Sequence, residues 1–444
     1  MALKLECCLS FSEEQDPYAF SSHKLLNKAV HKGSLRLRGP DGEAEMIGGQ
    51  APGPSVAIHI TDASYDWKIP LNPELYSGEA YMSGHLLMEQ GDIYELLELF
   101  FVNKRHFDLT ASQIYWKSIA RKLRRWHQHN PLRRSKKNVQ HHYDLGNDFY
   151  RLFLDEDLQY SCGYFPSGDE GLTEAQLLKK RHIAAKLHLQ DGQNLLDIGC
   201  GWGGLSLYLA QLFDIEVTAV SLSEEQLKLA RSRAEHLGLQ DKVRFHLMDY
   251  RELTERFDRV VSVGMLEHVG VGHLDRYFLS VRDRLNETGL ALIHSISSKA
   301  PPGITGPFLA KYIFPGGYSP SLSEVFSSVE KSGLWALDVE IWRKHYGWTL
   351  RAWRERCLAE KVRIVEMYDE RFFRMWEFYL AACEGAFMHG ASHVFQLQLA
   401  RQRDAVPLTR GYIETATKRF AEKDREISER LARSTVQAFE NLKS

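Results

Sequence analysis

Apolar positions between residues 138 and 405 alternate between two periods. Short runs rich in β-branched residues ("QNLLDIG", "IEVTAVS", "KVRFHLMD", "FDRVVSVG", "GLALIHSIS") are separated by stretches with helical spacing, such as "GGLSLYLAQLF" and "SEEQLKLARSRAEHLG". Such alternation is typical of a parallel sheet covered by helices on both faces. We therefore expect an α/β fold with a doubly wound, Rossmann-like sheet. After residue 300 the pattern is aromatic and less regular, apart from two strand candidates, "WALDVEIW" and "HVFQLQLARQ".

Different patterns flank this region. Residues 1–115 combine the strand candidates "GSLRLRG" and "SVAIHIT" with a helical pattern in "DIYELLELFFVNK", and a Gly/Pro-rich stretch, "GGQAPGPS", separates the strands. This combination predicts a small amino-terminal α+β domain. In residues 409–444 apolar residues lie on one interrupted stripe of a charged helix. Such a helix either caps the sheet or pairs with a second copy of the chain.

Composition narrows the class of protein. The chain has 444 residues, of which 44% are hydrophobic and 26% charged, as in ordinary globular proteins. No apolar stretch approaches the roughly 20 residues of a membrane helix, and acidic residues stand where a signal peptide is apolar. We expect a cytoplasmic protein. The six cysteines are scattered without metal-binding spacing, so we expect neither a metal site nor a disulfide framework.

Positive charge is concentrated between residues 116 and 137, which we interpret as a basic amphipathic helix and linker. Lys117–Lys137 contains nine Lys and Arg residues and no acid, so the rest of the chain carries a net charge of −11. The segment fits a solvated face, a nucleic-acid contact or an anionic membrane surface. Trp116 and Trp126 lie among the basic residues, which favours the membrane interface over nucleic acid.

The stretch "NLLDIGCGWGGLS", residues 194–206, has four glycines within six positions. Gly199, Gly201 and Gly204 satisfy the G-x-G-x-x-G pattern of nicotinamide and flavin dinucleotide sites. Those sites also need a carboxylate at the end of the second strand, where this chain has Ser221. Asp197 instead precedes the first glycine, as in the first motif of class I S-adenosylmethionine-dependent methyltransferases, which this stretch resembles. A purely structural glycine turn is the remaining alternative.

Blocks around this loop resemble cyclopropane-fatty-acyl-phospholipid synthases. They are "HHYDLGNDFYRLFLDEDLQYSCGYF", "SVGMLEHVG", "KYIFPGGYSPS", "HYGWTLRAWRER" and "AACEGAF", in order over residues 138–408, and "GEAYMSG" at 78–84 resembles an amino-terminal motif. The resemblance implies methylene transfer from S-adenosylmethionine to the cis double bond of phospholipid acyl chains. Methyl-branching and amine-methylating enzymes share many blocks, so both remain alternatives. A non-catalytic lipid-binding protein is a rival from another class.

The resemblance also implies a bound bicarbonate as the base of the reaction. The matching positions for its pocket are Cys162, Glu267, His294, Ile296 and Tyr346, with His345 as a rival to Tyr346. An anion that shares a proton suits histidine and tyrosine donors together with backbone amides. Glu267 follows the fourth strand and His294 is expected to end the fifth, so both should lie at the ligand-binding edge of the sheet.

The same matching gives the cofactor site. Its residues are Tyr160, Ser161, Asp197, Gly199, Cys200, Gly201, Gly203, Ser221, Gln226, Asp249 and Tyr250. Gln226 is expected to contact the ribose in place of the missing carboxylate. Ser297 and Ser319 stand where the family usually has glycine and leucine.

The resemblance implies partners as well. We expect membrane phospholipids with unsaturated acyl chains as substrate and a position on the inner face of the membrane. The amino-terminal domain is expected to bind lipid or a partner subunit, and the resemblance allows a homodimer.

Overall fold

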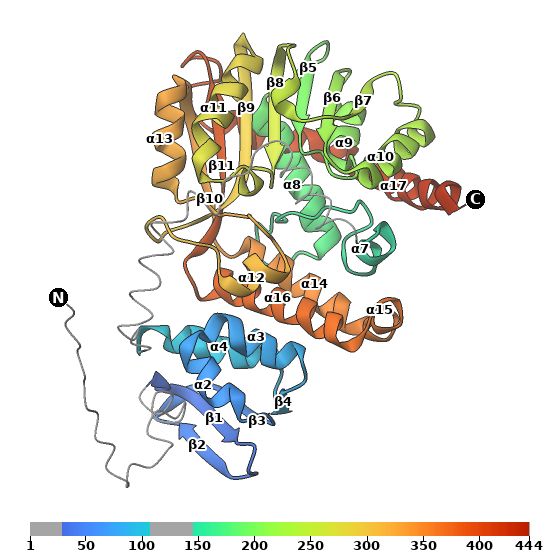
Figure 1. Cartoon of the computed structure of the whole chain (residues 1–444). Coiled ribbons are helices and arrows are strands. Elements are labelled where there is room, and N and C mark those ends of the chain that lie inside the picture. Colours follow the sequence, from blue (N-terminus) through green and yellow to red (C-terminus); the bar gives the residue numbers. More distant parts are fainter. Residues whose placement is uncertain (1–28, 107–144, 444) are drawn as a thin grey trace, which may run out of the picture. The chain divides into compact units, whose positions relative to one another are not determined.

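The computed structural model describes residues 29–106 and 145–443 and divides the chain into two compact units, Met1–Thr110 and Ala111–Ser444 (Figure 1). The basic segment 116–137 and the predicted domain boundary at residue 115 lie outside the described residues.

The amino-terminal unit is a four-stranded sheet with helices. Its strands have the order β2-β1-β3-β4, and β1 runs parallel to β3 whereas the other pairs are antiparallel. The elements are β1 (Lys32–Arg38), β2 (Ala44–Gly48), β3 (Ala51–Ile60), α2 (Ser64–Leu71), α3 (Pro73–Met82), β4 (Leu86–Gln90), α4 (Ile93–Asn103) and η1 (Lys104–His106). Asp92 and Glu95 form a capping box that begins α4. The Gly/Pro-rich stretch "GGQAPGPS" belongs largely to β3, which begins at Ala51 and pairs with β1.

The second unit contains a seven-stranded sheet of order β10-β11-β9-β8-β5-β6-β7. This sheet confirms the predicted α/β class, because its five strands from β9 to β7 are parallel and only β11 runs antiparallel to its two neighbours, β9 and β10. The strands are β5 (Asn194–Ile198), β6 (Glu216–Ser221), β7 (Val243–Leu247), β8 (Phe257–Val263), β9 (Leu285–Ser298), β10 (Trp335–Trp342) and β11 (Ser392–Ala400).

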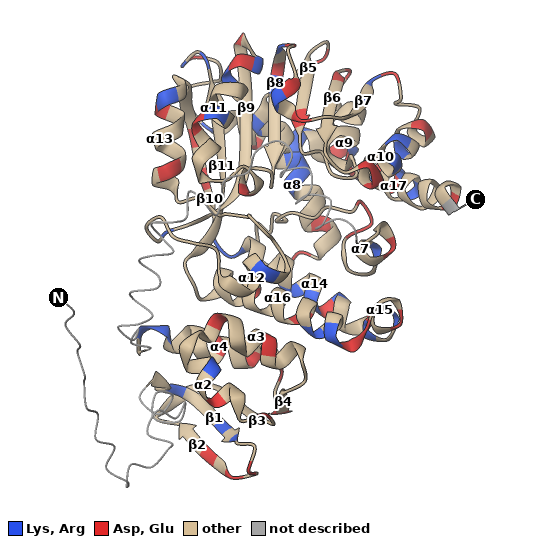
Figure 2. Ribbon diagram, viewed as in Figure 1, with Lys and Arg blue, Asp and Glu red and all other residues tan. Residues whose placement is uncertain are grey.

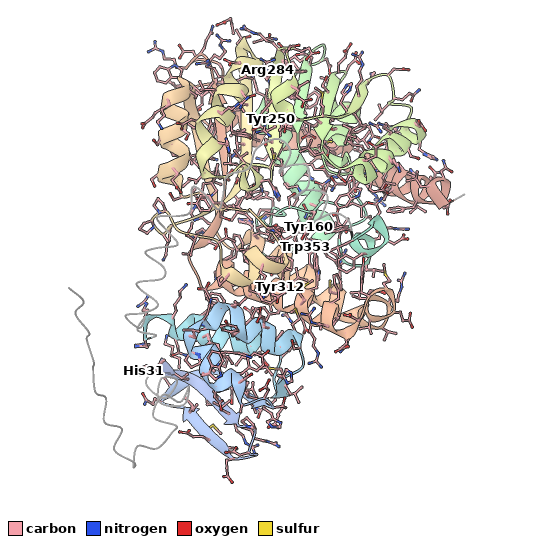
Figure 3. The ribbon with its side chains drawn as sticks, in the orientation of Figure 1. His31, Tyr160, Tyr250, Arg284, Tyr312 and Trp353 are labelled. Carbon is pink, nitrogen blue, oxygen red and sulfur yellow. The ribbon has the colours of Figure 1, made fainter. Side chains whose placement is uncertain are left out.

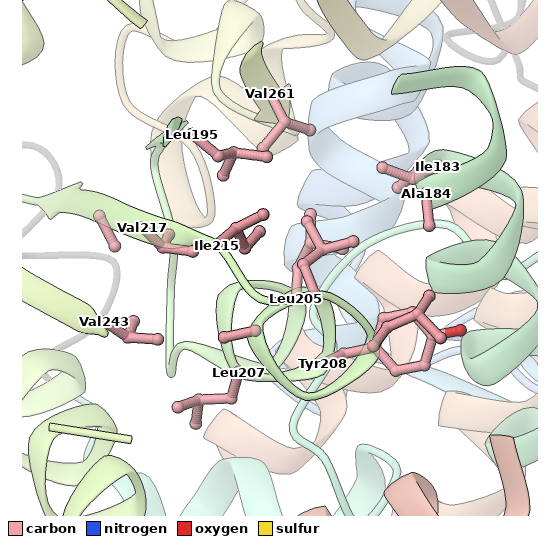
Figure 4. Packing of buried hydrophobic residues seen from close by; sticks show 14 of the residues in the cluster. Ile183, Ala184, Leu195, Leu205, Leu207, Tyr208, Ile215, Val217, Val243 and Val261 are labelled. Carbon is pink, nitrogen blue, oxygen red and sulfur yellow. The ribbon is translucent and has the colours of Figure 1, made fainter. Parts of the chain in front are cut away.

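Helices cover the sheet and bury its apolar faces. They include α8 (Leu172–Leu187), α9 (Gly204–Leu212), α10 (Glu224–Leu237), α11 (Leu274–Arg284) and α13 (Leu322–Ser332). Figure 4 shows side chains of α8 and α9 meeting those of β5, β6 and β7, with Leu205, Ile215 and Val217 in the cluster. Short 3-10 turns, η2 (Tyr250–Glu252), η3 (Leu266–His268) and η4 (Val271–His273), follow the ends of β7 and β8.

The long carboxy-terminal helix α17 (Gly411–Lys443) packs within its own chain. Its stripe joins the core formed by α8, α9 and α10 through Ile413, Phe420, Ile427 and Leu431. Asp424 on the same helix pairs with Arg181 and accepts a hydrogen bond from Tyr208 at 2.7 Å. The helix therefore caps the layer formed by α8, α9 and α10, which is the first of the two roles considered for it.

The aromatic region after residue 300 is mainly helical. It contains α12 (Pro307–Tyr312), α14 (His345–Ala359), α15 (Lys361–Met367) and α16 (Glu370–Met388), and the short α7 (Asn147–Phe153) packs near them. Trp353 and Trp376 are almost fully buried, and Phe149 contacts the ring of Trp376. Helices that bury aromatic residues on several sides lose the clear one-stripe pattern, so the sequence looked irregular here.

Charged residues follow the outer helices. Figure 2 shows acidic and basic residues along α10, α13 and α17, whereas the strands are mostly uncharged. Basic residues also occur in the middle of α8, where Lys179 and Lys180 are buried. In the described part of the chain, no helix combines the length and the apolar character needed to cross a membrane.

Candidate functional site

A cavity lies at the carboxyl ends of the parallel strands, around the glycine loop. Ten of the eleven predicted cofactor residues line it: Tyr160, Ser161, Asp197, Gly199, Cys200, Gly201, Ser221, Gln226, Asp249 and Tyr250. They come from four separate chain segments that the sheet brings together. This position, next to the strand where the order of the sheet reverses, is where doubly wound sheets bind ligands.

The glycine loop turns because its glycines adopt positive φ. Gly199, Gly201 and Gly203 have φ of 85°, 55° and 79°, which favour glycine. The backbone N–H groups of Gly199 and Cys200 both donate to the carbonyl of Val220, at 2.9 and 3.2 Å. Backbone groups of β6 therefore fix the loop before α9 begins.

Gly203 is the predicted cofactor residue that does not line the cavity. A Cβ atom built on Gly203 would lie 2.7 Å from the ring of Phe245. The position requires glycine because of packing against β7 as well as its positive φ. Its part in the site is thus to let the loop close against the sheet.

Asp197 is the penultimate residue of β5 and lines the cavity. Its Oδ2 accepts a hydrogen bond from the Ser206 hydroxyl at 2.7 Å, and burial raises the pKa of its carboxyl to about 6. Ser206 lies on α9, so this bond joins the strand to the helix on either side of the glycine loop.

Polar groups after β6 and β7 form the opposite wall. The Ser221 hydroxyl lies 3.4 Å from Oε1 of Gln226, which stands in the first turn of α10. Asp249 accepts two hydrogen bonds from the guanidinium of Arg251, at 2.7 and 2.6 Å. Arg251 also lines the cavity, and nothing in the sequence pattern had distinguished it.

Tyr160 and Ser161 form a third wall, beside an aromatic cluster. The ring of Tyr160 lies 5.1 Å from that of Trp353, and Figure 3 labels both. The Tyr160 hydroxyl lies 3.1 Å from that of Tyr379. Electron-rich ring faces thus gather next to the cavity.

None of the five residues predicted for the base pocket lines this cavity, but Glu267 contacts Ile296, and His294 lies on the same strand as Ile296. The Glu267 Oε1 accepts the backbone N–H of Ile296 at 2.7 Å, and burial raises the pKa of Glu267 to about 7. Its Oε2 is buried and has no hydrogen-bond partner among the described residues. His294 is two residues before Ile296 on β9, so their side chains share one face of the strand.

His294 does not end its strand as expected, since β9 continues to Ser298. The extension arises because β11 pairs with β9 over its full length, as far as Ser392 opposite Ser298. The His294 ring lies 3.2 Å from the Gln396 amide of that strand, and burial lowers its pKa well below the ordinary histidine value. His294 is therefore a neutral imidazole in this environment.

Cys162 and Tyr346 form the second part of the predicted base pocket. The N–H of Gly163 donates to the Thr349 hydroxyl at 2.9 Å, so the segment containing Cys162 docks on α14, which carries Tyr346. Burial raises the pKa of the Cys162 thiol. His345, the rival of Tyr346, accepts the N–H of Phe165 through Nδ1 at 2.9 Å, which indicates a structural role.

The two unusual serines lie near each other in the structure. The buried Ser297 hydroxyl donates to the carbonyl of Pro320 at 2.7 Å, and Ser319 is the residue before that proline. The segment containing Pro315 and Gly316, which line the cavity, leads directly into this contact.

Comparisons with known proteins show the family of the chain. The family model for mycolic acid cyclopropane synthetase matches residues 130–397. A probable fatty acid methyltransferase of Pseudomonas putida is 36% identical over 370 residues, 82% of this chain and 91% of the relative. The cyclopropane-fatty-acyl-phospholipid synthase of Escherichia coli K12 is 43% identical over 263 residues, 59% of this chain and 66% of the relative.

A solved structure has the same fold. The mycolic acid cyclopropane synthase CmaA1, in a complex with S-adenosylhomocysteine and CTAB, is 32% identical with a TM-score of 0.57. The match covers 61% of this chain and 99% of that structure. The chain thus belongs to the mycolic acid cyclopropane synthetase family of S-adenosylmethionine-dependent methyltransferases.

Proposed function

We propose that this methyltransferase adds a methylene from S-adenosylmethionine across the cis double bond of an unsaturated phospholipid acyl chain, forming a cyclopropane. The observation that carries the proposal is the place of Glu267. Its neighbours Met265 and His268 line the cofactor cavity, whereas its own carboxyl is buried beside Ile296 with one oxygen unpaired. A buried acid beside a methyl-donor site suits a reaction in which a proton leaves near the transferred carbon.

We assign cofactor binding to the ten predicted residues that line the cavity. S-adenosylmethionine supplies an electrophilic methyl group when bound. Ser221 and Gln226 offer a hydroxyl and an amide for the ribose, in the place of the usual carboxylate. Arg251 fixes Asp249 through two hydrogen bonds, so this carboxylate is held rigidly as an acceptor at the wall.

The aromatic residues beside the cavity suit the charge that develops on the acyl chain. Attack by an alkene on a methyl sulfonium leaves a carbocation on the substrate. Ring faces stabilise cations, and Tyr160, Trp353 and Tyr346 form a connected cluster with ring separations of 5.1 and 5.8 Å. The cluster also excludes water, which otherwise would trap the cation.

The residues of the predicted base pocket fit a bound bicarbonate. The unpaired Oε2 of Glu267 needs a polar partner, and a carboxyl with a pKa of about 7 can donate a proton to an anion as well as accept one. Bicarbonate, when bound, supplies the base for the proton that the new methyl group must lose. Glu267, His294, Tyr346 and the backbone at Cys162 would hold it, while the N–H of Ile296 orients Glu267. The raised pKa keeps the Cys162 thiol neutral, so it does not act as a nucleophile.

We further propose that the protein docks peripherally on the anionic inner face of the membrane. The proposal rests on the basic residues and tryptophans of segment 116–137. Reversing the charge of Arg121, Arg124 and Arg125 should weaken binding to anionic vesicles and leave S-adenosylhomocysteine affinity unchanged. Unchanged vesicle binding would contradict this placement. Sedimentation of the full chain tests whether it forms a homodimer.

A methyl-branching reaction on the same acyl chain is the second candidate. It is supported by the similarity to the probable fatty acid methyltransferase of P. putida, which covers more of the chain than the other relative. A small-amine substrate is the third. All three candidate reactions use the same cofactor cavity. They differ in the molecule that accepts the one-carbon group.

Transfer of label from methyl-labelled S-adenosylmethionine to phospholipid vesicles tests the acceptor class. We expect label in vesicles of cis-monounsaturated phosphatidylglycerol and none in vesicles with saturated chains. Equal labelling of both would contradict reaction at a double bond. Labelling of a small amine in place of either lipid would favour the third candidate.

A further inference from the structure

One face of α8 holds the turn formed by residues 155–161, which contributes to the cavity wall. Gln176 donates through Nε2 to the backbone carbonyls of Gln159 and Ser161, at 3.3 and 2.8 Å. Lys179 donates to the side chains of the same two residues. Three and four positions are one turn of a helix, so Gln176, Lys179 and Lys180 lie on one face.

The turn held by this face is strained. Leu158 has φ of 57°, in the region that favours glycine, although it is a branched apolar residue. Asp155 stabilises the turn by accepting the N–H of Gln159 at 2.7 Å. A non-glycine residue keeps such a conformation only where its surroundings fix it, and here the conformation places Tyr160 and Ser161 in the cavity wall.

The charge balance beneath the turn is uneven. Asp157 forms ion pairs with both Lys180 and Arg233, and all three are buried. With Asp155 and Lys179, this buried cluster contains three cations and two carboxylates. One positive charge is therefore in excess, and it lies at the cavity side, because Lys179 lines the cavity whereas Lys180 and Arg233 do not.

Lys179 carries that excess. Its side chain is fully buried, and its ammonium donates to two neutral acceptors, Oγ of Ser161 at 2.7 Å and Oε1 of Gln159 at 2.9 Å. An ammonium has three donors, so one N–H remains without a protein acceptor in the part of the chain that the structure describes. Within those same residues, no carboxylate lies within ion-pair distance of it. A buried cation without a direct counter-ion is costly to maintain unless an anion joins it.

We propose that Lys179 binds an oxyanion of the carboxylate type at the wall between the cofactor cavity and the predicted base pocket. Two sources offer this chemistry: the α-carboxylate of the cofactor's amino-acid end, and bicarbonate. Both fit the position, since Ser161 lines the cofactor cavity and the next residue, Cys162, belongs to the predicted base pocket. The inference rests on the proposed function and adds to it the charged group that attracts the anion.

The charged groups around Lys179 also favour anion binding by its ammonium. The charged and titratable groups that face Lys179 are Asp155, Asp157, Lys180, Cys162 and His294. Burial lowers the pKa of Lys179 to about 8, so a bound anion would stabilise its protonated form.

Binding measurements on Lys179→Gln test the proposal, because glutamine keeps a donor for Ser161 but removes the charge. The probes are S-adenosylhomocysteine, 5′-methylthioadenosine, which lacks the amino-acid end, and ¹³C-bicarbonate followed by its NMR line width. If the cofactor carboxylate is the ligand, K179Q weakens S-adenosylhomocysteine binding about tenfold or more and changes 5′-methylthioadenosine less than about twofold. If bicarbonate is the ligand, its half-saturating concentration rises about tenfold and both nucleosides bind as before.

Matched variants separate charge from structure. K179R should retain anion binding, and K228M, which removes an exposed lysine paired with Glu225, should change nothing. Unchanged binding of all three probes in folded K179Q would overturn the proposal. Failure of wild-type protein to bind 5′-methylthioadenosine or S-adenosylhomocysteine would instead overturn the proposed function itself.

If K179Q does not fold, a measurement on the wild-type protein tests whether Lys179 binds the anion. The deaminated analogue of S-adenosylhomocysteine keeps the carboxylate without a titrating amine, and bicarbonate stays monoanionic between about pH 7.5 and 9.5. Lys179 loses its proton as the pH rises through this range. The affinity for one of these anions, relative to that for 5′-methylthioadenosine, should therefore fall. Ratios that stay constant for both anions would overturn the proposal.

Discussion

The carboxyl group of Glu267 accepts the backbone N–H of Ile296 at 2.7 Å through one oxygen, while its other oxygen is buried without a partner among the described residues. The two residues lie 29 positions apart, in η3 and β9, and parallel pairing of β8 with β9 brings them together. A half-satisfied buried carboxyl is expensive unless it has a functional partner. This relationship is the strongest local sign of chemistry outside the cofactor cavity.

Glu267→Gln should reduce turnover strongly. We expect a loss of about 100-fold, typical for a group that assists proton transfer, because the amide cannot exchange a proton with an anion. S-adenosylhomocysteine affinity should stay within about twofold, since Glu267 does not line the cavity. Steady-state kinetics and calorimetry check both values. A loss of less than tenfold would count against the assignment of Glu267.

The same substitution should change how stability depends on pH. Because burial raises the pKa of Glu267 from 4.5 to about 7, the folded state binds more protons than the unfolded state between these values. The contribution of Glu267 to the free energy of unfolding is fully present below pH 4.5 and is lost as the pH rises through 7. Between pH 4.5 and pH 7, the free energy of unfolding of the wild type should fall by about 3 kcal/mol relative to that of E267Q. Denaturation at several pH values gives the free energy of unfolding of each protein. The same pH dependence in the wild type and in E267Q would contradict the raised pKa.

Arg233→Met should destabilise the fold and weaken cofactor binding together. Arg233 is fully buried, pairs with Asp157 and donates to the carbonyl of Trp202 in the glycine loop at 2.8 Å. Removing it breaks the buried ion pair with Asp157 and takes the donor from the Trp202 carbonyl, which costs about 3–5 kcal/mol. Urea unfolding and S-adenosylhomocysteine titration provide the two readouts. The control R244M removes an exposed pair with Glu216 and should cost less than about 1 kcal/mol.

Phe420→Ala tests whether α17 belongs to the core. The Phe420 ring is 5% exposed and packs against Phe213 at 5.2 Å, so its loss should cost about 3–5 kcal/mol. Val436 lies on the same helix and is 49% exposed, so V436A should change stability by about 0.5 kcal/mol or less. Equal effects of the two substitutions would contradict the observed packing of the helix.

Local patterns made much of the cofactor site predictable. The glycine loop, Asp197 and the polar residues after the next strands each follow a strand in sequence, and parallel strands bring their carboxyl ends to one edge. The assignment of individual residues, including Tyr160 and Ser161, came from the resemblance to the family's motifs, and ten of the eleven residues line the cavity. Gly203 does not line the cavity, and its packing against Phe245 could not be seen in the sequence.

Buried charges could not be predicted in the same way. Lys179 and Lys180 lie in "LLKKRH", which looks like the solvated face of a helix. Their burial depends on the 155–161 turn, and Leu158 gives no sequence signal that it adopts a left-handed conformation. Arg233 likewise looks like one of several exposed charges on α10. The helices after residue 300 were missed because their aromatic residues are buried on several sides.

The most direct test of the central claim is mass spectrometry of cis-monounsaturated phospholipid vesicles after incubation with the protein and S-adenosylmethionine. Both a cyclopropane and an unsaturated methyl branch add the mass of one methylene, so the product is then exposed to ozone, which cleaves alkenes and spares cyclopropanes. We expect a heavier acyl chain that resists ozone. A heavier chain that ozone still cleaves would contradict cyclopropane formation and identify a methyl-branching enzyme.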